Sequence, residues 1–374
     1  MQYREFGRTG KKVSLLGFGA MRLPKDEDEA IRIMRRAIDL GVNYVDTARL
    51  YGESERIVGM ALKDGYREKV YLSTKVMPTE QPAWRESFEK SMELLDVQRI
   101  DFLQAVHDLS WKGYTEKYTQ ANGARPDVLK ARDEGLITHI CFSCHDNPEN
   151  MTKLIDTGEF EGITLQYNLL DRTNEDVIAH AHEQGMGVVI MGPVGGGRLA
   201  APSEVLEAMK SKGRHISSTA GLALRFVFAN PHVSIAISGM NTMEMVEENV
   251  ATASHDESLS PSELADIRRS VEELEALGKQ FCTGCRYCMP CPNNVAIPGI
   301  FEAYILHKVW GQTKEARARY ARWFSGKPAY PNDTGFATRL SATACVECGE
   351  CEPKCPQKIP IIAQLKEAHE ELGE

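Results

Sequence analysis

The stretch Asp46-Thr47-Ala48-Arg49-Leu50-Tyr51-Gly52-Glu53-Ser54-Glu55 joins a short apolar run, Tyr44–Thr47, to a longer charged pattern, Glu53–Lys63. The first run has the length and composition of a buried strand, and the second has the periodicity of a helix with one solvated face. A strand that leads through a short loop into a helix is one β-then-α unit of a parallel sheet. The stretch therefore predicts an α/β fold.

The same unit recurs over residues 1 to about 255. We expect eight strands, at Leu15–Gly19, Tyr44–Thr47, Val70–Val76, Ile100–Val106, Ile137–Ser143, Ile163–Tyr167, Val188–Met191 and Val233–Ser238. Eight such units over this length predict a (β/α)8 barrel. The alternative is a doubly wound open sheet, but no G-x-G-x-x-G motif follows the first strand. Arg4–Phe6 and Val13–Leu15 flank Thr9-Gly10 and predict a hairpin ahead of the barrel.

Eight of the ten cysteines lie in two tight runs after residue 280. The second run has the C-x2-C-x2-C-x3-C-P spacing of bacterial 4Fe–4S ferredoxins, in which the fourth cysteine ligates the neighbouring cluster. The first run departs from this pattern by one residue in its last gap. The two runs are Cys282, Cys285, Cys288 and Cys291, followed by Pro292, and Cys345, Cys348, Cys351 and Cys355, followed by Pro356.

This spacing predicts two 4Fe–4S clusters with exchanged fourth ligands. Cluster one takes Cys282, Cys285, Cys288 and Cys355, and cluster two takes Cys345, Cys348, Cys351 and Cys291. The alternative is a pair of zinc sites, but these usually take two C-x2-C pairs rather than a triple followed by C-P. We expect a barrel over residues 1–270 and a mostly α-helical, two-cluster ferredoxin-like domain over residues 271–374.

A basic segment with interleaved aromatic residues, Lys308–Lys327, lies between the runs. We interpret it as a helix that packs Trp310, Tyr320 and Trp323 on the clusters and leaves a basic face in solvent. Nucleic-acid binding is disfavoured because the chain carries a net charge of −9. A docking patch for an acidic electron carrier is a third interpretation.

The bulk composition is that of an ordinary globular protein, with 42% apolar and 26% charged residues. The sequence has no apolar window long enough for a membrane span, and its start is too polar for a signal peptide. We therefore expect a cytoplasmic protein that binds neither membrane nor nucleic acid. In that compartment, ten cysteines indicate metal or redox chemistry rather than disulfides.

Four residues whose side chains could take part in catalysis stand at or just after strand ends: Asp46, Tyr51, Lys75 and His107. The C-terminal ends of barrel strands are where active sites gather. Together with the stretch Asp46–Glu55, with Phe6–Gly10 and with Leu16–Leu23, these residues resemble the catalytic tetrad and motifs of the aldo-keto reductases, specifically an iron–sulfur subgroup of that family. The resemblance covers residues 1 to about 255.

The resemblance implies a role for each member of the tetrad. Tyr51 is the general acid that protonates a substrate carbonyl, and Lys75 lowers the pKa of Tyr51 by favouring the phenolate. Asp46 pairs with Lys75, and His107 orients the carbonyl. Hydride comes from a nicotinamide, NADP(H) or NAD(H), at the barrel mouth. His107 stands six residues after Asp101, where five are expected, so a β-bulge is needed to turn its side chain into the barrel.

The resemblance also implies cofactor contacts at the ends of five strands. The residue after Ser143 is Cys144 where the family usually has Asn, and Met191 stands where a tyrosine often stacks. Gly239 and Met245 stand where a basic pair often holds the 2′-phosphate, so the choice between NADPH and NADH stays open. The implied contacts are Gly19, Ala20, Met21, Ser143, Gln166, Met191, Gly239, Met240, Asn241, Glu248 and Asn249.

Cys141 and Cys144 lie three apart on a predicted strand, so they point to opposite faces and do not form a disulfide in regular geometry. We interpret Cys141 as a core residue and keep Cys144 as a candidate cofactor contact.

The sequence thus predicts an oxidoreductase that acts on a small carbonyl or alcohol. Nicotinamides move electron pairs whereas clusters move single electrons, so three accounts stay open. The clusters are structural, or they exchange electrons with a ferredoxin-like or flavoprotein partner, or the chain is an electron-transfer or regulatory module whose barrel is no nicotinamide-dependent reductase.

Overall fold

The structure is a computed structural model that describes residues 1–77, 80–200, 203–213, 215–278, 282, 288–325, 340–355 and 358–373. It divides into two compact units. The first combines Met1–Gly196 with Ala220–Ser260, and the second combines Gly197–Thr219 with Pro261–Glu374. The domain boundary that we place between residues 270 and 271 stays a prediction.

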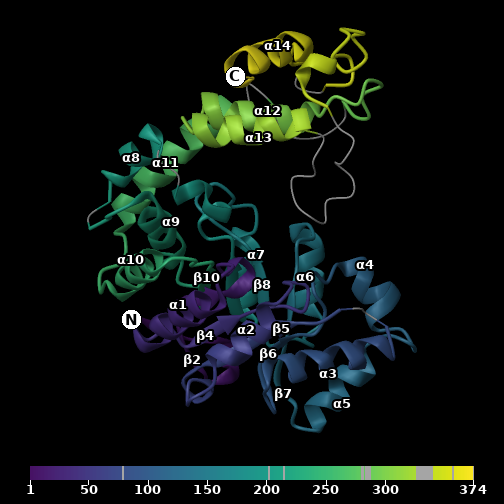
Figure 1. The fold of residues 1–374 in the computed structure, drawn as a ribbon, viewed down its shortest axis with the longest axis vertical. Coiled ribbons are helices and arrows are strands. Elements are labelled where there is room, and N and C mark those ends of the chain that lie inside the picture. Colours follow the sequence, from purple (N-terminus) through teal and green to yellow (C-terminus); the bar gives the residue numbers. More distant parts are fainter. Residues whose placement is uncertain are drawn as a thin grey trace. The chain divides into compact units, whose positions relative to one another are not determined.

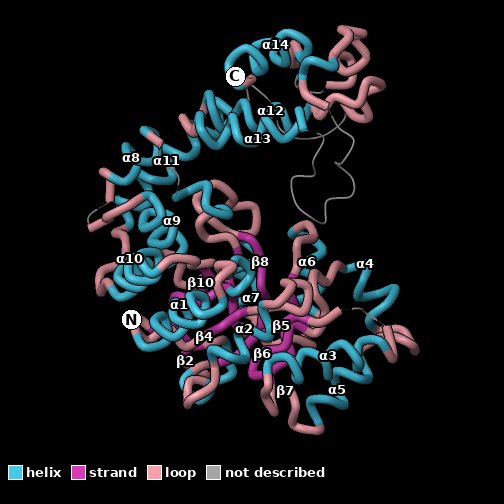
Figure 2. The backbone as a smooth tube through the Cα atoms, in the orientation of Figure 1, coloured by secondary structure: helices cyan, strands magenta, loops and turns pink. Residues whose placement is uncertain are grey.

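The first unit is a closed barrel of eight parallel strands in the order β10-β3-β4-β5-β6-β7-β8-β9, which confirms the predicted barrel (Figure 1). Helices surround the strands on the outside, as Figure 2 shows. The barrel strands are β3 (Leu16–Gly19), β4 (Tyr44–Asp46), β5 (Tyr71–Lys75), β6 (Ile100–Gln104), β7 (Ile137–Ser143), β8 (Gly162–Gln166), β9 (Gly187–Met191) and β10 (Ile235–Ser238).

Several helices of this unit bury one apolar stripe, as α1 shows. In α1, the buried residues Ala30, Ile33, Met34, Ala37 and Ile38 recur at the spacing of one helix face, and the Asp26 side chain caps the first turn by accepting from the Glu29 amide. The helices are α1 (Glu27–Asp39), α2 (Ser54–Ala61), α3 (Ala83–Leu95), α4 (Trp111–Gly113), α5 (Arg125–Asp133), α6 (Pro148–Asp156), α7 (Glu175–Glu183), α9 (Thr219–Phe228) and α10 (Met243–Ser254).

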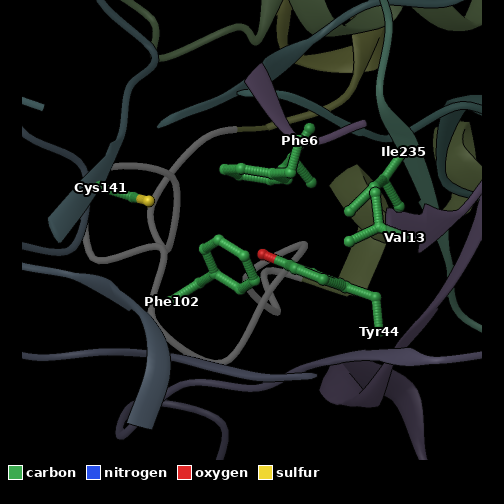
Figure 3. Packing of buried hydrophobic residues seen from close by; sticks show 7 residues of the cluster. Phe6, Val13, Tyr44, Phe102, Cys141 and Ile235 are labelled. Atoms are coloured by element: carbon green, nitrogen blue, oxygen red, sulfur yellow. The ribbon is translucent and has the colours of Figure 1, made fainter. Parts of the chain in front are cut away.

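The predicted N-terminal hairpin is present as β1 (Tyr3–Glu5) and β2 (Lys12–Ser14), paired antiparallel. Phe6 follows β1 and enters the barrel at the N-terminal ends of the strands, where its ring centroid lies 4.3 Å from that of Phe102 (Figure 3). Gly187 leaves the room for it, because a Cβ atom there would lie 2.2 Å from the Phe6 ring. The hairpin therefore closes the end of the barrel opposite the strand C-termini.

The second unit is helical in its described part. Its helices are α8 (Glu204–Lys210), α11 (Pro261–Gly278), α12 (Ile297–Lys308), α13 (Thr313–Ser325) and α14 (Ile361–Leu372), of which α12 packs against α13 and α14. Trp310, Tyr320 and Trp323 are buried, so the aromatic residues of the basic segment pack inward. The expected contact of these rings with the clusters stays a prediction. Among the described residues, no helix combines the length and apolarity needed to cross a membrane.

Candidate active site and cysteine pocket

Asp46 and Lys75 form a buried ion pair inside the barrel. They end neighbouring strands, β4 and β5, with Asp46 in register with Ser73. Lys75 Nζ lies 2.5 Å from Asp46 Oδ1 and donates to the Thr47 carbonyl at 2.9 Å, while Ser73 Oγ donates to Asp46 Oδ2 at 3.2 Å. Burial alone lowers the pKa of Lys75, but the Asp46 carboxylate and Tyr51 together outweigh this effect and leave that pKa above its ordinary value. Lys75 is therefore a cation at neutral pH.

Tyr51 lies beside this cation, in the loop between β4 and α2. Lys75 Nζ is 5.1 Å from the centre of the Tyr51 ring. Burial raises the pKa of Tyr51, and the nearby Lys75 charge offsets only part of that rise. The net direction is opposite to the lowering that we expected, because desolvation of the phenolate outweighs the attraction of one lysine that is already paired with Asp46.

A β-bulge brings His107 into the barrel. The Val76 amide donates to the Gln104 carbonyl at 3.3 Å, and the His107 amide donates to the Val76 carbonyl at 2.8 Å. Ala105 and Val106 together therefore face Val76, where a regular ladder has one residue. Phe102 points into the barrel core, so strict alternation would turn Val106 inward and His107 outward. The extra residue reverses this, and the observed β6 accordingly ends at Gln104 rather than at Val106.

The ring of His107 meets Tyr51 edge to face, with the ring centroids 6.0 Å apart. Burial, aided by the Lys75 charge, lowers the pKa of His107 to about 4. Its Nδ1 atom is buried and has no hydrogen-bond partner among the residues that the structure describes. The structure thus brings the four predicted catalytic residues together. They provide a protonated phenol, a fixed cation and a neutral imidazole. These groups together can polarise and protonate a carbonyl oxygen.

The predicted nicotinamide contacts lie at the C-terminal ends of β3, β7, β8, β9 and β10, around the same mouth. The Ser143 hydroxyl accepts from the Asp108 amide at 3.0 Å, so its own proton is free to donate to a carboxamide oxygen. The Gln166 amide packs against Gly192, where a Cβ atom would lie 2.5 Å from Oε1. These groups fit the polar end of a nicotinamide.

The remaining contacts differ in how accessible they are. Met21 is 60% exposed and Asn241 is also exposed, whereas Ala20 and Met240 are buried. Asn249 Nδ2 is bound to Ser238 Oγ at 3.2 Å, and the Glu248 carbonyl accepts from Thr252. Gly19, Met191 and Glu248 are partly exposed.

Sequence reasoning missed Arg22. One guanidinium nitrogen of Arg22 donates to the Gly196 carbonyl at 2.8 Å, and the Arg22 Cβ atom lies 3.8 Å from where a Cβ on Gly239 would stand. The Arg22 side chain therefore starts beside Gly239, one of the two positions without a basic residue, and its guanidinium reaches the loop that contains Gly196. The glycine-rich segment Gly192–Gly197, directly after β9, is the sequence signal that would have drawn attention to this loop.

One pocket in the second unit gathers five of the predicted cluster ligands. It is lined by Cys288, Cys291, Cys345, Cys348 and Cys351, with apolar walls that include Val295, Ile297, Ile362 and Leu365. The backbone turns that bring Cys345, Cys348 and Cys351 to one side use positive φ angles at Glu347 and Gly349. Four of the five are the set that we assigned to cluster two. Thiols around an apolar pocket fit an iron–sulfur cluster.

The other three predicted cluster cysteines do not belong to this pocket in the described part of the chain. Cys282 and Cys355 are partly exposed and do not line the pocket, and Cys285 lies outside the described residues. No three His, Cys, Asp or Glu side chains within the described ranges stand in a ready-made metal geometry.

Cys141 and Cys144 are both free thiols and both fully buried. Cys141 belongs to the barrel core with Phe6 and Phe102, as predicted (Figure 3). Burial raises the pKa of Cys144 to about 12, so that side chain is a neutral thiol.

Comparisons with known proteins agree with this geometry. The model described as "Aldo/keto reductase family" matches residues 15–272, and the "4Fe-4S dicluster domain" model matches residues 281–359. L-galactose dehydrogenase of Arabidopsis thaliana is 27% identical over an alignment of 317 residues that covers 74% of this chain and 96% of that protein. An uncharacterized oxidoreductase of Schizosaccharomyces pombe is 30% identical over 268 residues, covering 64% of this chain and 82% of that one.

Among solved structures, the holo form of the aldo-keto reductase AKR11C1 from Bacillus halodurans matches with a TM-score of 0.62 and 26% identity, covering 73% of this chain and 96% of that chain. The barrel, the two family models and these relatives lead to one assignment. The chain belongs to the aldo/keto reductase family of oxidoreductases and carries a 4Fe-4S dicluster domain after its barrel.

Proposed function

We propose that the barrel catalyses nicotinamide-dependent reduction of a small carbonyl compound, or oxidation of the matching alcohol. The observation that carries the proposal is the buried Lys75–Asp46 pair beside Tyr51 and His107. A bound nicotinamide would supply the hydride.

The chain's own residues would divide the remaining work. Tyr51 donates its phenolic proton to the carbonyl oxygen as negative charge develops there. Lys75 stabilises the phenolate that results, and Asp46 keeps Lys75 charged and in place. His107 is neutral near pH 7, so it binds the carbonyl oxygen as a neutral hydrogen-bond donor and does not compete with Tyr51 as an acid.

The nucleotide would be held by Gly19, Ala20 and Met21 on one side of the mouth. The other predicted contacts, grouped on β7 to β10 and α10, are Ser143, Gln166, Met191, Gly239, Met240, Asn241, Glu248 and Asn249. Gly239 and Met245 offer no charge to a 2′-phosphate, but the side chain of Arg22 starts beside Gly239. We therefore propose that the site accepts NADP(H) or NAD(H), with Arg22 as the candidate cation for the nucleotide phosphates.

We further propose that the second unit holds two 4Fe–4S clusters with exchanged fourth ligands. The gathering of Cys291 with Cys345, Cys348 and Cys351 around one pocket supports this assignment for cluster two. Thiolate ligation requires reduced cysteines, which suits a cytoplasmic protein. A ferredoxin-like or flavoprotein partner would exchange electrons with the clusters one at a time.

The test is anaerobic turnover of the full-length, cluster-loaded protein with NADPH or NADH and a panel of small aldehydes and ketones. Wild type is compared with Tyr51→Phe and with the control Tyr66→Phe. The Tyr66 hydroxyl donates to the Asp39 carboxylate on the outer surface of the barrel, away from the four predicted catalytic residues. We expect oxidation of a nucleotide that Tyr51→Phe abolishes and Tyr66→Phe retains. If wild type shows no Tyr51-dependent oxidation of either nucleotide, the proposal is wrong.

A second function is favoured by one observation: Cys348, a proposed cluster ligand, is exposed at the surface of the second unit. A cluster held there could exchange electrons with a partner protein, so the chain would be an electron-transfer or regulatory module. Cys348→Ser separates the two functions. If a folded Cys348→Ser protein reduces carbonyl compounds as fast as wild type, the reductase function is favoured. If wild type reduces no carbonyl compound and Cys348→Ser loses electron transfer to a partner protein, the electron-transfer function is favoured.

A further inference from the structure

Glu55, at the end of the stretch that carries Tyr51, is a fully buried carboxylate outside the barrel interior. It stands in the first turn of α2, and its Oε1 atom accepts from Thr74 Oγ1 on β5 at 2.7 Å. Thr74 lies between Ser73 and Lys75, whose side chains reach Asp46 inside the barrel. Since side chains alternate along a strand, Thr74 points to the outer face of β5.

The stretch therefore holds β5 from both faces. At its first residue, Asp46 binds Ser73 and Lys75 on the inner face, and at its last residue, Glu55 binds Thr74 on the outer face. Between them, the Arg49 amide donates to the Lys75 carbonyl at 3.1 Å. We call this pair of attachments, Asp46 on the inner face and Glu55 on the outer face of β5, the clamp. Tyr51 lies between Asp46 and Glu55 in the sequence, so its position relative to Lys75 depends on both attachments.

The second oxygen of Glu55 faces weaker partners. Oε2 is buried, the Ser91 hydroxyl is a hydrogen-bonding neighbour of this carboxyl group, and the Arg49 guanidinium is 3.7 Å away. Burial raises the pKa of Glu55, while hydrogen bonds from Thr74 and Ser91 and the charge of Arg49 oppose the rise. A fully buried carboxyl group is costly to stability even when it is hydrogen-bonded, and groups with such perturbed pKa values are found where a side chain has a functional task. A purely structural site could be filled by an apolar side chain at lower cost.

We propose that Glu55 is a positioning residue for Tyr51, acting through Thr74 on the outer face of β5 and through Arg49 in the Tyr51 loop. The inference rests on the proposed function, because it assigns Glu55 to the same acid-catalysed step. It predicts that breaking the outer end of the clamp impairs proton donation and leaves nucleotide binding intact, since the predicted nucleotide contacts lie on other loops.

Thr74→Val is the sharpest test, because it removes the donor while it keeps the shape of the side chain. Thr74→Ser retains the hydroxyl and serves as the conservative variant. Thr138→Val is the matched control. Thr138 is also a barrel-strand threonine, on β7, and its buried hydroxyl has no hydrogen-bond partner in the described part of the chain. The three variants and wild type are compared as cluster-loaded, full-length proteins.

We expect Thr74→Val to lower kcat by roughly 10- to 100-fold, because a displacement of about 1 Å at a reacting group can cost that much. The KM for the nucleotide should change less than about threefold. Thr74→Ser should recover most of the rate, and Thr138→Val should match wild type. Glu55→Gln, which keeps an acceptor for Thr74 but loses the charge toward Arg49, should fall between wild type and Thr74→Val.

A readout that is independent of turnover follows the Tyr51 phenol by NMR of protein with 13C-labelled tyrosine. The pH titration of the Tyr51 signal should shift in Thr74→Val and stay unchanged in Thr138→Val. Wild-type kcat and an unshifted Tyr51 signal in folded Thr74→Val would overturn the inference. If wild type reduces no carbonyl at all, the proposed function fails, and the NMR comparison still decides whether Glu55 and Thr74 position Tyr51.

Discussion

Lys75 Nζ lies 2.5 Å from Asp46 Oδ1, and the side chains of both residues are 3% exposed. Water cannot screen such a pair, so each charge depends on the other. The pair also fixes the place of the cation beside Tyr51. The predictions that follow from this arrangement can be tested directly.

Asp46→Asn should impair both activity and stability. It leaves Lys75 buried without its counter-ion, and breaking a buried pair in this way costs roughly 3–5 kcal/mol in the free energy of unfolding. We expect a fall in kcat of at least about 100-fold, since Lys75 can no longer be held charged beneath the phenol. Asp64→Asn, at an exposed position with a surface partner, is the control and should change neither quantity measurably. The measurements are urea denaturation and steady-state turnover.

The pH profile of carbonyl reduction should be flat across the neutral range. Tyr51 has a raised pKa, so it stays protonated and able to donate until the pH exceeds about 10, its ordinary value. His107, with a pKa of about 4, stays neutral down to mildly acidic pH. We therefore expect no inflection near 6.5 in kcat, the value for an ordinary histidine. An inflection there that disappears in His107→Gln would contradict the assignment.

The same His107 should make the fold less stable in acid. The unfolded chain takes up a proton near pH 6.5, whereas native His107 resists protonation down to about 4. Stability contributed by neutral His107 is thus fully present above about 6.5 and is lost as the pH falls toward 4. His107→Gln should unfold with a smaller change in free energy between pH 7 and pH 4.5 than wild type, as measured by chemical denaturation at the two values.

Gly187→Ala should destabilise the barrel strongly. The added methyl group would meet the Phe6 ring at 2.2 Å, and neither the ring nor the strand has room to move in a packed core. Overpacking of this kind typically costs 1–3 kcal/mol, so we expect a Tm several degrees lower. Gly239→Ala, whose methyl group would meet nothing closer than 3.8 Å, is the matched control for stability. Equal Tm values for the two variants would argue against the position of Phe6.

The cysteines should separate into two classes on alkylation at pH 8 under anaerobic conditions. Cys141 and Cys144 are buried and have raised pKa values, so the native protein should leave them unlabelled. The cysteines of the C-terminal runs should be labelled only after the iron is removed with a chelator. Mass spectrometry of peptides identifies the labelled sites. Rapid labelling of Cys144 in the native protein would show that the mouth opens at that strand.

Cys291→Ser should remove one cluster and spare the other, because the proposal assigns Cys291 to cluster two alone. Iron and sulfide content should fall to about half, and the barrel should keep its melting transition. Loss of all iron would indicate that the two clusters form as one unit.

Much of this protein could be predicted from local sequence. The eight strands were identifiable because each is a short apolar run between helical patterns, and the cluster ligands because their spacing is specific to iron–sulfur binding. The tetrad residues were identifiable because they stand at strand ends or in the loops directly after them, within motifs that resemble those of the aldo-keto reductases. Arg22 was not, since its contact with Gly196 joins two loops far apart in the sequence.

By itself, the sequence determined the barrel, the two cysteine runs and the identity of Asp46, Tyr51, Lys75 and His107. Only the tertiary structure decided how these groups behave. The bulge at Ala105 and Val106 depends on hydrogen bonds to Val76 on another strand, and it is what turns His107 toward Tyr51. Likewise, Lys75 alone suggested a lowered Tyr51 pKa, but burial raises it, because desolvation depends on all the residues that exclude water and not on one neighbour in the sequence.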